Sequence, residues 1–525
     1  MEIIFLFILI GSLWFIRQIK VILFWLYLWQ LKEYHIGRFF DHFRTDKGKK
    51  LFLNWLFISK VALLFYALAL SFYPKFLPWH FYATWVFVLT AVYFFESVKF
   101  FANIILKKTK KPVPTQKTLT LILANLFFTI FFAFSLFKKI DYFYWFSFGL
   151  LSFDVLSSFL VSGIVLLFQP FAVLLRNRII KKAKEKRELV DELRSSSPFA
   201  NARVFKDLIV VGITGSYGKT STKEFLATIL SEKFRVLKTK KHQNSEVGIS
   251  QCILNDLKPE HEVFVCEMAA YNKGGIKLLC GIAKPKIGIL TGINEQHMAT
   301  FGSQENIIKT KYELIENLPA DGTAFFNAKN RYCQELYQKT QIKKFLYGEN
   351  ATFPGEENIL GAVAVAKELG MTDEEIIRAT GKIENKLSGI QLKKGANEIN
   401  IIDATYSANP DGVMAHLEYL KTFPGRKVII MPCLIELGRA SKEVHGRIGK
   451  KIAEVCDLAI ITTKDRFKEI KDGSTSLPQK AVEVLFLENP KKIFEKIKSF
   501  YQSGDIILLE SRVPDLLIKQ LEVSN

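Results

Sequence analysis

The sequence predicts an N-terminal α-helical membrane region with several spans, followed by two α/β domains. The first α/β domain is expected to hold a phosphate loop in a mostly parallel sheet, and the second to be Rossmann-like. One observation is composition: of 525 residues, the first 174 are dominated by Phe, Leu, Ile, Trp and Tyr, whereas residues 207–525 have ordinary globular composition. The later part also alternates strand-like and helix-like runs, as parallel sheets covered on both faces do. The third observation is a glycine-rich turn, VGITGSYGKTS, at residues 211–221.

Five apolar stretches in the first third are long enough to span a bilayer. They cover residues 3–29, 51–73, 80–101, 118–137 and 143–175. Arg17 and Lys20 interrupt the first stretch, so we expect that span to end near Phe15 and the chain to continue along the membrane interface. Glu96 is expected to pair with Lys99 at a membrane end. Asp154 lies inside the fifth stretch, and two interpretations stay open for it: a functional interior or a hydrogen bond between helices.

The loops between these stretches differ in charge. Residues 32–50, 107–117 and 176–187 are rich in Lys and Arg, whereas residues 74–79 and 138–141 hold few. The positive-inside rule then places the N-terminus outside and the C-terminal two-thirds in the cytoplasm, so the protein is expected to be integral to the cytoplasmic membrane. Residues 176–206 read as a basic linker on the membrane surface. The net charge of +21 is concentrated in such loops, which favours membrane lipids as partners and argues against nucleic acid.

The later two-thirds contain two series of strand-like runs. The first series covers residues 208–213, 263–267, 287–291 and 323–327, and the second covers 399–403, 427–431, 458–462, 482–487 and 505–509. A break near residues 386–396 separates them, which predicts domains at 207–387 and 388–525. The six cysteines form no C-x-x-C pair, so reduced thiols are expected in place of disulfides or a zinc ribbon.

The glycine-rich turn has the residues that bind a nucleoside triphosphate. Glycines let backbone N–H groups approach phosphate oxygens, a lysine reaches the β- and γ-phosphates, and a hydroxyl holds Mg²⁺ at the helix start. Ile213 occupies the first glycine position of the longer motif, so the shorter G-x-x-G-K-T form applies. The predicted nucleotide-binding residues are Gly215, Ser216, Tyr217, Gly218, Lys219, Thr220 and Ser221.

Further candidates follow strands. Glu267 ends the strand-like run VFVCE, where a carboxylate could hold Mg²⁺. His297 follows the run IGILT, at the sheet edge where ligands gather in open α/β folds. Lys311 lies in the helical run 303–317.

Several motifs then resemble those of the Mur ligases, in the same order along residues 208–512. They are TGSYGKTSTKE, CEMAAYNKGGI, TGINEQHMATFGS, KTKYELIENLPADGTAFFNA, DATYSANPDG and IELGRASKEVHGRIG. The resemblance implies an ATP-dependent ligase that forms a C–N (amide) bond through an acyl phosphate, with ATP and Mg²⁺ as cofactors. It further implies that an amino acid or a D-Ala-D-Ala-like dipeptide is added to a muropeptide precursor in cell-wall synthesis.

The resemblance also implies roles for single residues. Lys219 and Thr220 would serve the phosphates and the first Mg²⁺, with Glu267 as a metal ligand. His297 would hold the second Mg²⁺ together with Lys311 as a carbamate. The remaining matches, to nucleotide or substrate contacts, are Asn327, Asn358 and Asp403 on the nucleotide side and Asn244, Ser245, Tyr406, Asn409 and Pro410 on the substrate side.

Some positions depart from the family pattern. Ser245, Asn330, Glu357 and Ser407 replace the usual residues, and 388–391 lacks the expected Gly-Arg pair. Relatives carry a soluble domain that binds the UDP end of the substrate. Between the apolar stretches and the phosphate loop, this sequence leaves too few residues for such a domain. The acceptor is therefore expected to be UDP-linked with help from another envelope-synthesis protein, or polyprenyl-linked, which we favour. The alternatives are a Mur-like ligase or amidating enzyme acting on another lipid-linked or polymer substrate, and a nucleotide-regulated membrane scaffold with decayed ligase chemistry.

Overall fold

The structure is a computed structural model, and its described residues fall into two compact units. Residues 2–72, 78–137, 143–196, 207–240, 243–383, 390–395, 399–406, 409–475 and 482–522 are described. The units are Met1–Leu175 and Arg176–Asn525. The domain borders predicted at 206/207 and 387/388 touch residues outside the described ranges, so they stay predictions.

The described part of the first unit is helical. Its helices are α1 (Glu2–Leu31), α2 (Ile36–His42), α3 (Asp46–Lys49), α4 (Trp55–Phe72), α5 (Trp79–Ile105), α6 (Gln116–Phe137) and α7 (Phe143–Leu167). Among the described residues, five helical segments are long and apolar enough to cross a membrane: Phe5–Leu31, Trp55–Phe72, His80–Ile105, Gln116–Phe137 and Tyr144–Ser195. These segments correspond to the five apolar stretches of the sequence.

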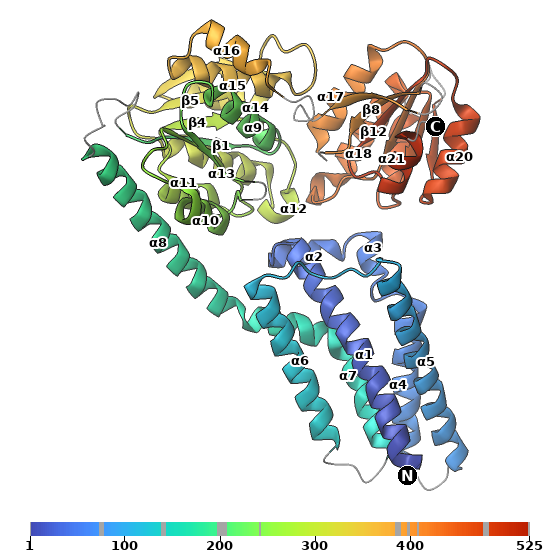
Figure 1. Cartoon of the computed structure of the whole chain (residues 1–525). Helices are drawn as coiled ribbons and strands as arrows, with labels where there is room; N and C mark the ends of the chain where they lie inside the picture. Colours follow the sequence, from blue (N-terminus) through green and yellow to red (C-terminus); the bar gives the residue numbers. More distant parts are fainter. Residues whose placement is uncertain are drawn as a thin grey trace. The chain divides into compact units, whose positions relative to one another are not determined.

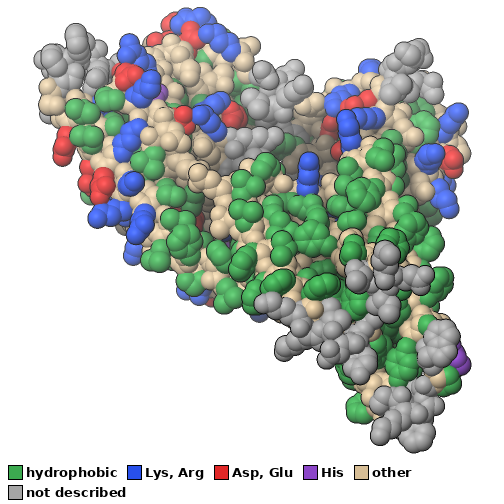
Figure 2. All heavy atoms as spheres, turned by 60° about the horizontal axis from the view of Figure 1, so that its bottom comes forward, with side chains coloured by type: hydrophobic (Ala, Val, Ile, Leu, Met, Phe, Trp, Pro, Cys, Tyr) green, Lys and Arg blue, Asp and Glu red, His purple; other side chains and the backbone are tan. Residues whose placement is uncertain are grey.

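The long helices of this unit pack side by side around α1, as Figure 1 shows. Trp14 and Tyr93 are fully buried between them. The outward side chains are apolar as well: Phe72, Phe87 and Phe127 are each 73% exposed, and hydrophobic side chains cover the visible face of the bundle in Figure 2. A water-soluble bundle would place polar groups there, so this surface suits the interior of a bilayer.

The first helix, α1, continues past Arg17 and Lys20 to Leu31, and where its span ends in a membrane stays a prediction. The expectation for Glu96 is wrong. Glu96 is 5% exposed, and its ion pairs are made inside the bundle instead of with Lys99 at a membrane end. The cause is a set of partners contributed by helices far apart in the sequence.

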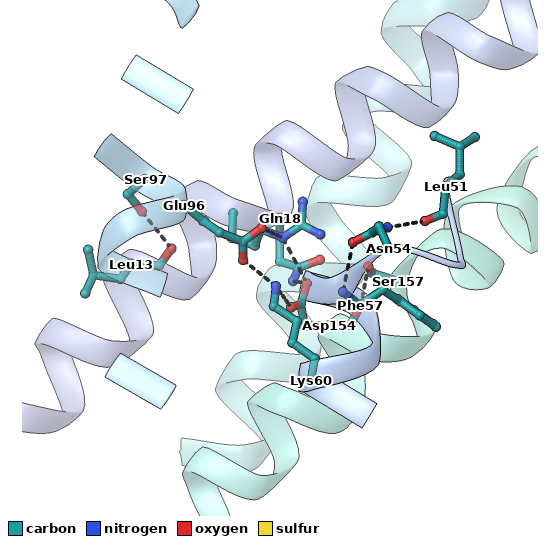
Figure 3. Close-up of polar contacts among 11 residues, drawn as sticks. Leu13, Gln18, Leu51, Asn54, Phe57, Lys60, Glu96, Ser97, Asp154 and Ser157 are labelled. Atoms are coloured by element: carbon teal, nitrogen blue, oxygen red, sulfur yellow. Dashed lines mark hydrogen bonds and ion pairs between the residues drawn. The ribbon is translucent and has the colours of Figure 1, made fainter. Parts of the chain in front are cut away.

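This set, here called the buried ion network, consists of Arg17, Lys60, Glu96 and Asp154 from α1, α4, α5 and α7. Lys60 Nζ lies 2.6 Å from Asp154 Oδ2 and also pairs with Glu96. Arg17 Nε lies 3.0 Å from Glu96 Oε1 and 3.5 Å from Asp154 Oδ1. Gln18 donates a hydrogen bond to Asp154 (Figure 3). With two positive and two negative side chains the network carries no net charge, which makes its burial tolerable.

Removing Lys60 alone should therefore destabilise the bundle more than removing a balanced pair. Lys60→Met leaves an unpaired carboxylate and should cost about 3 kcal/mol, whereas Lys60→Met with Asp154→Leu restores neutrality and should cost less. The measurement is thermal unfolding of the full chain in detergent, with the exposed Lys99→Met as control. Equal losses in the single and double variants would contradict the charge-balance argument.

The fifth apolar stretch is two helices instead of one. α7 ends at Leu167, and α8 (Gln169–Ser195) begins after Phe168. Pro170 explains the break, because proline lacks an N–H and is tolerated only in the first turn of a helix.

The second half of α8 packs on the first α/β domain. Ile180, Ala183 and Val190 belong to the hydrophobic core of that domain. Arg194 is fully buried and donates hydrogen bonds to the carbonyls of Pro259, at 2.9 Å, and His261. This face of the predicted membrane-surface linker is thus occupied by protein contacts.

The first α/β domain contains a six-stranded parallel sheet of order β2-β3-β1-β4-β5-β6, with helices on both faces. Its strands are β1 (Ile209–Thr214), β2 (Val236–Lys238), β3 (Val263–Glu267), β4 (Ile287–Leu290), β5 (Thr323–Asn327) and β6 (Lys343–Tyr347). Its helices are α9 (Lys219–Leu230), α10 (Glu246–Asp256), α11 (Gly275–Ala283), α12 (Met298–Phe301), α13 (Gln304–Glu316), α14 (Arg331–Lys339), α15 (Glu356–Glu368) and α16 (Asp373–Thr380). Chain order reverses beside β1, so the carboxyl end of this central strand is the expected place for a ligand.

The second α/β domain contains a sheet of order β11-β10-β9-β12-β8-β7, parallel except for β7. Its strands are β7 (Gln391–Lys394), β8 (Asn400–Ala404), β9 (Lys427–Met431), β10 (Leu458–Ile461), β11 (Glu483–Phe486) and β12 (Ile506–Glu510). Its helices are α17 (Pro410–Lys421), the 3₁₀ turn η4 (Gly438–Ala440), α18 (Ser441–Val455), α19 (Phe467–Ser474), α20 (Pro490–Phe500) and α21 (Asp515–Glu522). The predicted α/β architecture of both domains is confirmed.

Candidate active site

The glycine-rich turn joins the central strand β1 to helix α9. Gly218 is the residue before α9 and has φ +77°, a left-handed conformation that favours glycine. A Cβ on Gly218 would lie 2.4 Å from Asn358 Oδ1, and a Cβ on Gly215 would lie 2.1 Å from Thr291 Oγ1. Glycine is therefore required at both positions, and the turn presents its N–H groups at the start of a helix.

Lys219 folds back over this turn. Its Nζ lies 2.7 Å from the Gly215 carbonyl and 3.3 Å from that of Ser216. Burial lowers the pKa of Lys219, and the carboxylate of Glu267 opposes that shift. The ammonium group thus lies where a phosphate would meet the loop.

Glu267 at the end of β3 gathers several polar groups. Its Oε1 accepts hydrogen bonds from Thr220 Oγ1 at 3.1 Å and from Asn244 Nδ2 at 2.9 Å. Its Oε2 lies 3.5 Å from Nζ of Lys223, a fully buried lysine that the motif analysis missed. The signal was available, because Lys223 lies four residues after Lys219 on the same face of α9. Carboxylate, hydroxyl and amide oxygens are ligands that suit Mg²⁺.

Lys311 and His297 supply two further basic groups. Lys311 on α13 is 2% exposed. Burial and then the positive charge of Lys219 lower the pKa of Lys311 to about 7. Burial also lowers the pKa of His297, Glu436 opposes this, and the charges of Lys311 and Lys219 lower it further. For both side chains burial is the largest cause of the shift, and it favours the neutral form.

Within the described residues, no group of three or more His, Cys, Asp or Glu side chains is placed to hold a metal ion. Glu267 and Thr220 still offer adjacent oxygen ligands, and phosphate oxygens would supply others. His297 offers a ring nitrogen, and Lys311 would become an oxygen ligand on carbamylation. The residues present therefore fit Mg²⁺ when it arrives with a nucleotide.

A cavity of about 1020 Å³ opens beside the phosphate loop, and both α/β domains line it. The predicted residues along it are Ser216, Tyr217, Gly218, Lys219, Thr220, Ser221, Asn327, Asn358, Tyr406 and Asn409. Asn327 donates to the Thr291 carbonyl at 2.8 Å, and Asn358 accepts from Thr222 Oγ1 at 3.1 Å. Both amides are thus held in place at the cavity wall.

The other predicted site residues do not line this cavity: Gly215, Asn244, Ser245, Glu267, His297, Lys311, Asp403 and Pro410. The carboxylate of Asp403 pairs with Lys393 at 2.6 Å and accepts a hydrogen bond from Thr405. Ser245 caps helix α10 through a hydrogen bond from the Gly248 N–H. Pro410 is the first residue of α17 and is buried.

Two residues that depart from the family pattern also have local partners. Asn330 caps α14 and donates to the Ile293 carbonyl at 2.9 Å. Glu357 lines the cavity, and burial raises its pKa. Ser407, like residues 388 and 389, lies outside the described residues.

Two acidic residues at this site could not be given a role from the sequence alone. Burial, followed by the charge of Glu295, raises the pKa of Asp411 to about 6, while Arg447 opposes the shift. Glu436, in the loop after β9, contacts His297, with Nδ1 and Oε2 2.7 Å apart. Both residues stand in the quoted motifs, yet Glu295 and His297, which they face, belong to the first α/β domain.

The fold and site together define a nucleotide-dependent enzyme, with a phosphate loop in one α/β domain and a second α/β domain across the cavity. Residues 213–391 match the Mur ligase middle domain, and residues 390–512 match the domain described as Mur ligase, glutamate ligase domain. The chain belongs to the Mur ligase family and is an ATP-dependent ligase that forms amide bonds. The expected cofactors, ATP and Mg²⁺, are those of this family.

Relatives and solved structures agree with this assignment. A protein of Synechocystis sp. named UDP-N-acetylmuramoyl-tripeptide--D-alanyl-D-alanine ligase is 28% identical over 330 residues, 58% of this chain and 71% of the relative. The protein of that name in Bacillus subtilis is 27% identical over 334 residues, 58% and 72% of the two chains. MurF ligase from Thermotoga maritima, solved in complex with ADP, is 25% identical with a TM-score of 0.53, covering 66% of this chain and 83% of that one.

A second solved structure supports the fold alone. MurF from Acinetobacter baumannii has a TM-score of 0.54 at 22% identity, covering 66% of this chain and 79% of that chain. The curated relatives above are named for the ligation of D-alanyl-D-alanine, the dipeptide alternative of the sequence analysis.

Proposed function

We propose that the protein is a membrane-anchored Mur ligase that adds a D-alanyl-D-alanine-like dipeptide to a muropeptide precursor on the cytoplasmic side. One observation carries the proposal. A single cavity is lined by Lys219 and Thr220 of the phosphate loop and by Tyr406 and Asn409 of the second α/β domain. One wall can hold ATP while the other can present the incoming amine.

In this proposal the loop backbone and Lys219 bind the β- and γ-phosphates of ATP. Thr220 and Glu267 would hold the first Mg²⁺, and His297 with carbamylated Lys311 would hold the second. Bound Mg²⁺ neutralises charge on the transferring phosphoryl group. Asn244 and the buried Lys223 orient the Glu267 carboxylate.

The reaction forms and breaks two bonds. An oxygen of the substrate carboxylate attacks the γ-phosphorus, and the bond to ADP breaks. The amine of the dipeptide then attacks the acyl carbon, phosphate leaves, and the amine loses a proton. Contact between the two α/β domains would exclude water, which otherwise hydrolyses the acyl phosphate.

The departures from the family pattern do not favour a decayed enzyme. Ser245 and Asn330 each cap a helix, so these changes keep the local backbone. The phosphate loop, Glu267, His297 and Lys311 are all present. A scaffold without chemistry would have no need of this complete set.

We further propose that the acceptor is linked to a polyprenyl lipid. The support is the first unit, whose helices expose phenylalanine side chains. This unit precedes the phosphate loop, where relatives are expected to carry the domain that binds the UDP end of the substrate. Anchoring enzyme and acceptor in one membrane raises their effective concentration.

The test supplies purified full chain with ATP, Mg²⁺, dipeptide and either a lipid-linked or a UDP-linked tripeptide muropeptide. Mass spectrometry should show the dipeptide adduct mainly on the lipid-linked acceptor, with release of phosphate. A higher rate on the UDP-linked acceptor would contradict lipid presentation, and turnover without any adduct would contradict the ligase assignment.

A chimera tests whether the membrane region has a specific role or serves only as an anchor. Residues 1–167 are replaced by an unrelated anchor of the same orientation, and α8 is kept because its second half belongs to the core of the first α/β domain. Full activity on the lipid-linked acceptor would leave anchoring as the whole role of the bundle.

Tyr406 should act on the amine more than on ATP. Its side chain is 62% exposed and lines the cavity from the second α/β domain. Tyr406→Ala should raise the KM for the dipeptide by about tenfold, the loss of roughly 1.4 kcal/mol of binding, with a smaller change for ATP. Tyr406→Phe serves as the control for ring packing, and equal effects on both substrates would contradict the placement.

A further inference from the structure

The loop between β9 and η4 reaches the candidate metal ligand His297 from the other α/β domain. Glu436 in this loop is 6% exposed, and its Oε2 lies 2.7 Å from His297 Nδ1. A carboxylate on one ring nitrogen is the arrangement that orients histidine ligands in metal sites.

The backbone on both sides of this contact is strained. His297 has φ +66° and Glu436 has φ +65°, in the left-handed region that residues other than glycine seldom adopt. Such conformations persist where the surroundings enforce them, and they gather at functional sites.

Two more contacts hold the loops together. The Ala299 N–H donates to the Glu436 carbonyl at 3.1 Å. Gly438 has φ +52°, and a Cβ there would lie 3.0 Å from the Ala299 nitrogen. A larger residue would push the loop away from α12, so glycine permits the approach that brings Glu436 to His297.

The ring of His297 is held on a second side. Tyr271 packs edge-to-face against the imidazole, with centroids 4.9 Å apart and planes at 88°. Tyr271 belongs to the first α/β domain and Glu436 to the second. A carboxylate can only accept, so Nδ1–H donates the hydrogen bond to Glu436 and the lone pair of the imidazole lies on Nε2.

We propose that Glu436 is a positioning residue for His297, which fixes the tautomer and orientation that present Nε2 to Mg²⁺. The second metal site is then complete only when the two α/β domains are in contact, so that metal binding and domain contact favour each other. This inference rests on the assignment of His297 as a metal ligand under the proposed function.

The test measures Mn²⁺ binding to the full chain in detergent with ADP, by electron paramagnetic resonance. Glu436→Ala should weaken one Mn²⁺ site by about tenfold or more, as loss of such a partner does in other metal sites, and leave the other site unchanged. Glu436→Gln should weaken the same site less, because its amide oxygen still accepts from Nδ1. Glu443→Gln, an exposed carboxylate in the same domain, is the matched control and should bind as the parent does.

His297→Ala distinguishes the two ways in which the idea could fail. If His297→Ala loses the site and both Glu436 variants bind as the parent does, the positioning role is overturned while the ligand assignment stands. If His297→Ala keeps both sites, the ligand assignment fails and the inference fails with it. Should Glu436→Ala fold poorly by its melting temperature, the isosteric Glu436→Gln decides, and unchanged Mn²⁺ affinity in that variant overturns the proposal.

Discussion

Lys219→Ala should reduce ATP turnover and ligation by about 10³-fold, the scale seen when one preorganised charge-stabilising group is lost. Lys219 is the one residue of the turn at 215–221 with a cationic side chain, and its ammonium lies against the loop carbonyls at 2.7 and 3.3 Å. Loss of this charge removes the lysine partner of the γ-phosphate as negative charge moves during transfer.

The fold should tolerate this change. The glycines that shape the turn remain, and α9 keeps its apolar packing on the sheet. Phosphate release and thermal unfolding are measured side by side, with Lys277→Ala, an exposed lysine on α11, as control. Near-normal turnover in Lys219→Ala would remove the nucleotide-site assignment.

Lys311→Ala should lower ligation by about 10²-fold or more, because a ligand of the second metal and its charge are lost. Short carboxylates such as acetate should restore part of the rate by filling the place of the carbamate. Lys309→Ala, two residues away on α13 and exposed, is the matched control. Absence of any rescue, together with an unmodified lysine in the active enzyme by mass spectrometry, would contradict the carbamate.

The same lysine predicts a pH dependence. Carbamylation joins a neutral amine to CO₂ and releases a proton, so the protonated form cannot react. With its pKa lowered to about 7, Lys311 is mostly protonated below pH 7 and mostly neutral above it. Stimulation of the enzyme by bicarbonate should therefore grow between about pH 6 and 8. Stimulation that is flat over this range would contradict the neutral-amine requirement.

The sequence predicted the central strands well and the edge strands poorly. β3 and β5 have the predicted bounds because their residues are buried on both faces and read as apolar runs. β2, β6 and β7 lie at sheet edges and were missed. β6 has the sequence KKFLY and β7 has QLKK, so partial exposure removes the apolar signal.

The candidate site likewise contains residues that could be predicted from the sequence and residues that could not. The phosphate loop is a local pattern, so its residues could be named before the structure. Glu436 and Arg17 could not be assigned roles, because their partners come from distant segments: His297 for the first, Glu96 and Asp154 for the second. The ion pair of Asp403 with Lys393 on the neighbouring strand β7 could not be predicted either, because it joins two strands of the folded sheet.

The buried ion network has a consequence for how the protein is made. Its members leave the ribosome in the order Arg17, Lys60, Glu96 and Asp154. The two cations therefore emerge before either anion, and the charges balance only once α7 has been synthesised. In a membrane, α1 and α4 would each carry an unpaired charge until α5 brings Glu96, and one positive charge would stay unbalanced until α7 brings Asp154, at a cost of a few kcal/mol. We expect these helices to stay near the insertion machinery until the last apolar helix arrives, so that the bundle enters the lipid as one group.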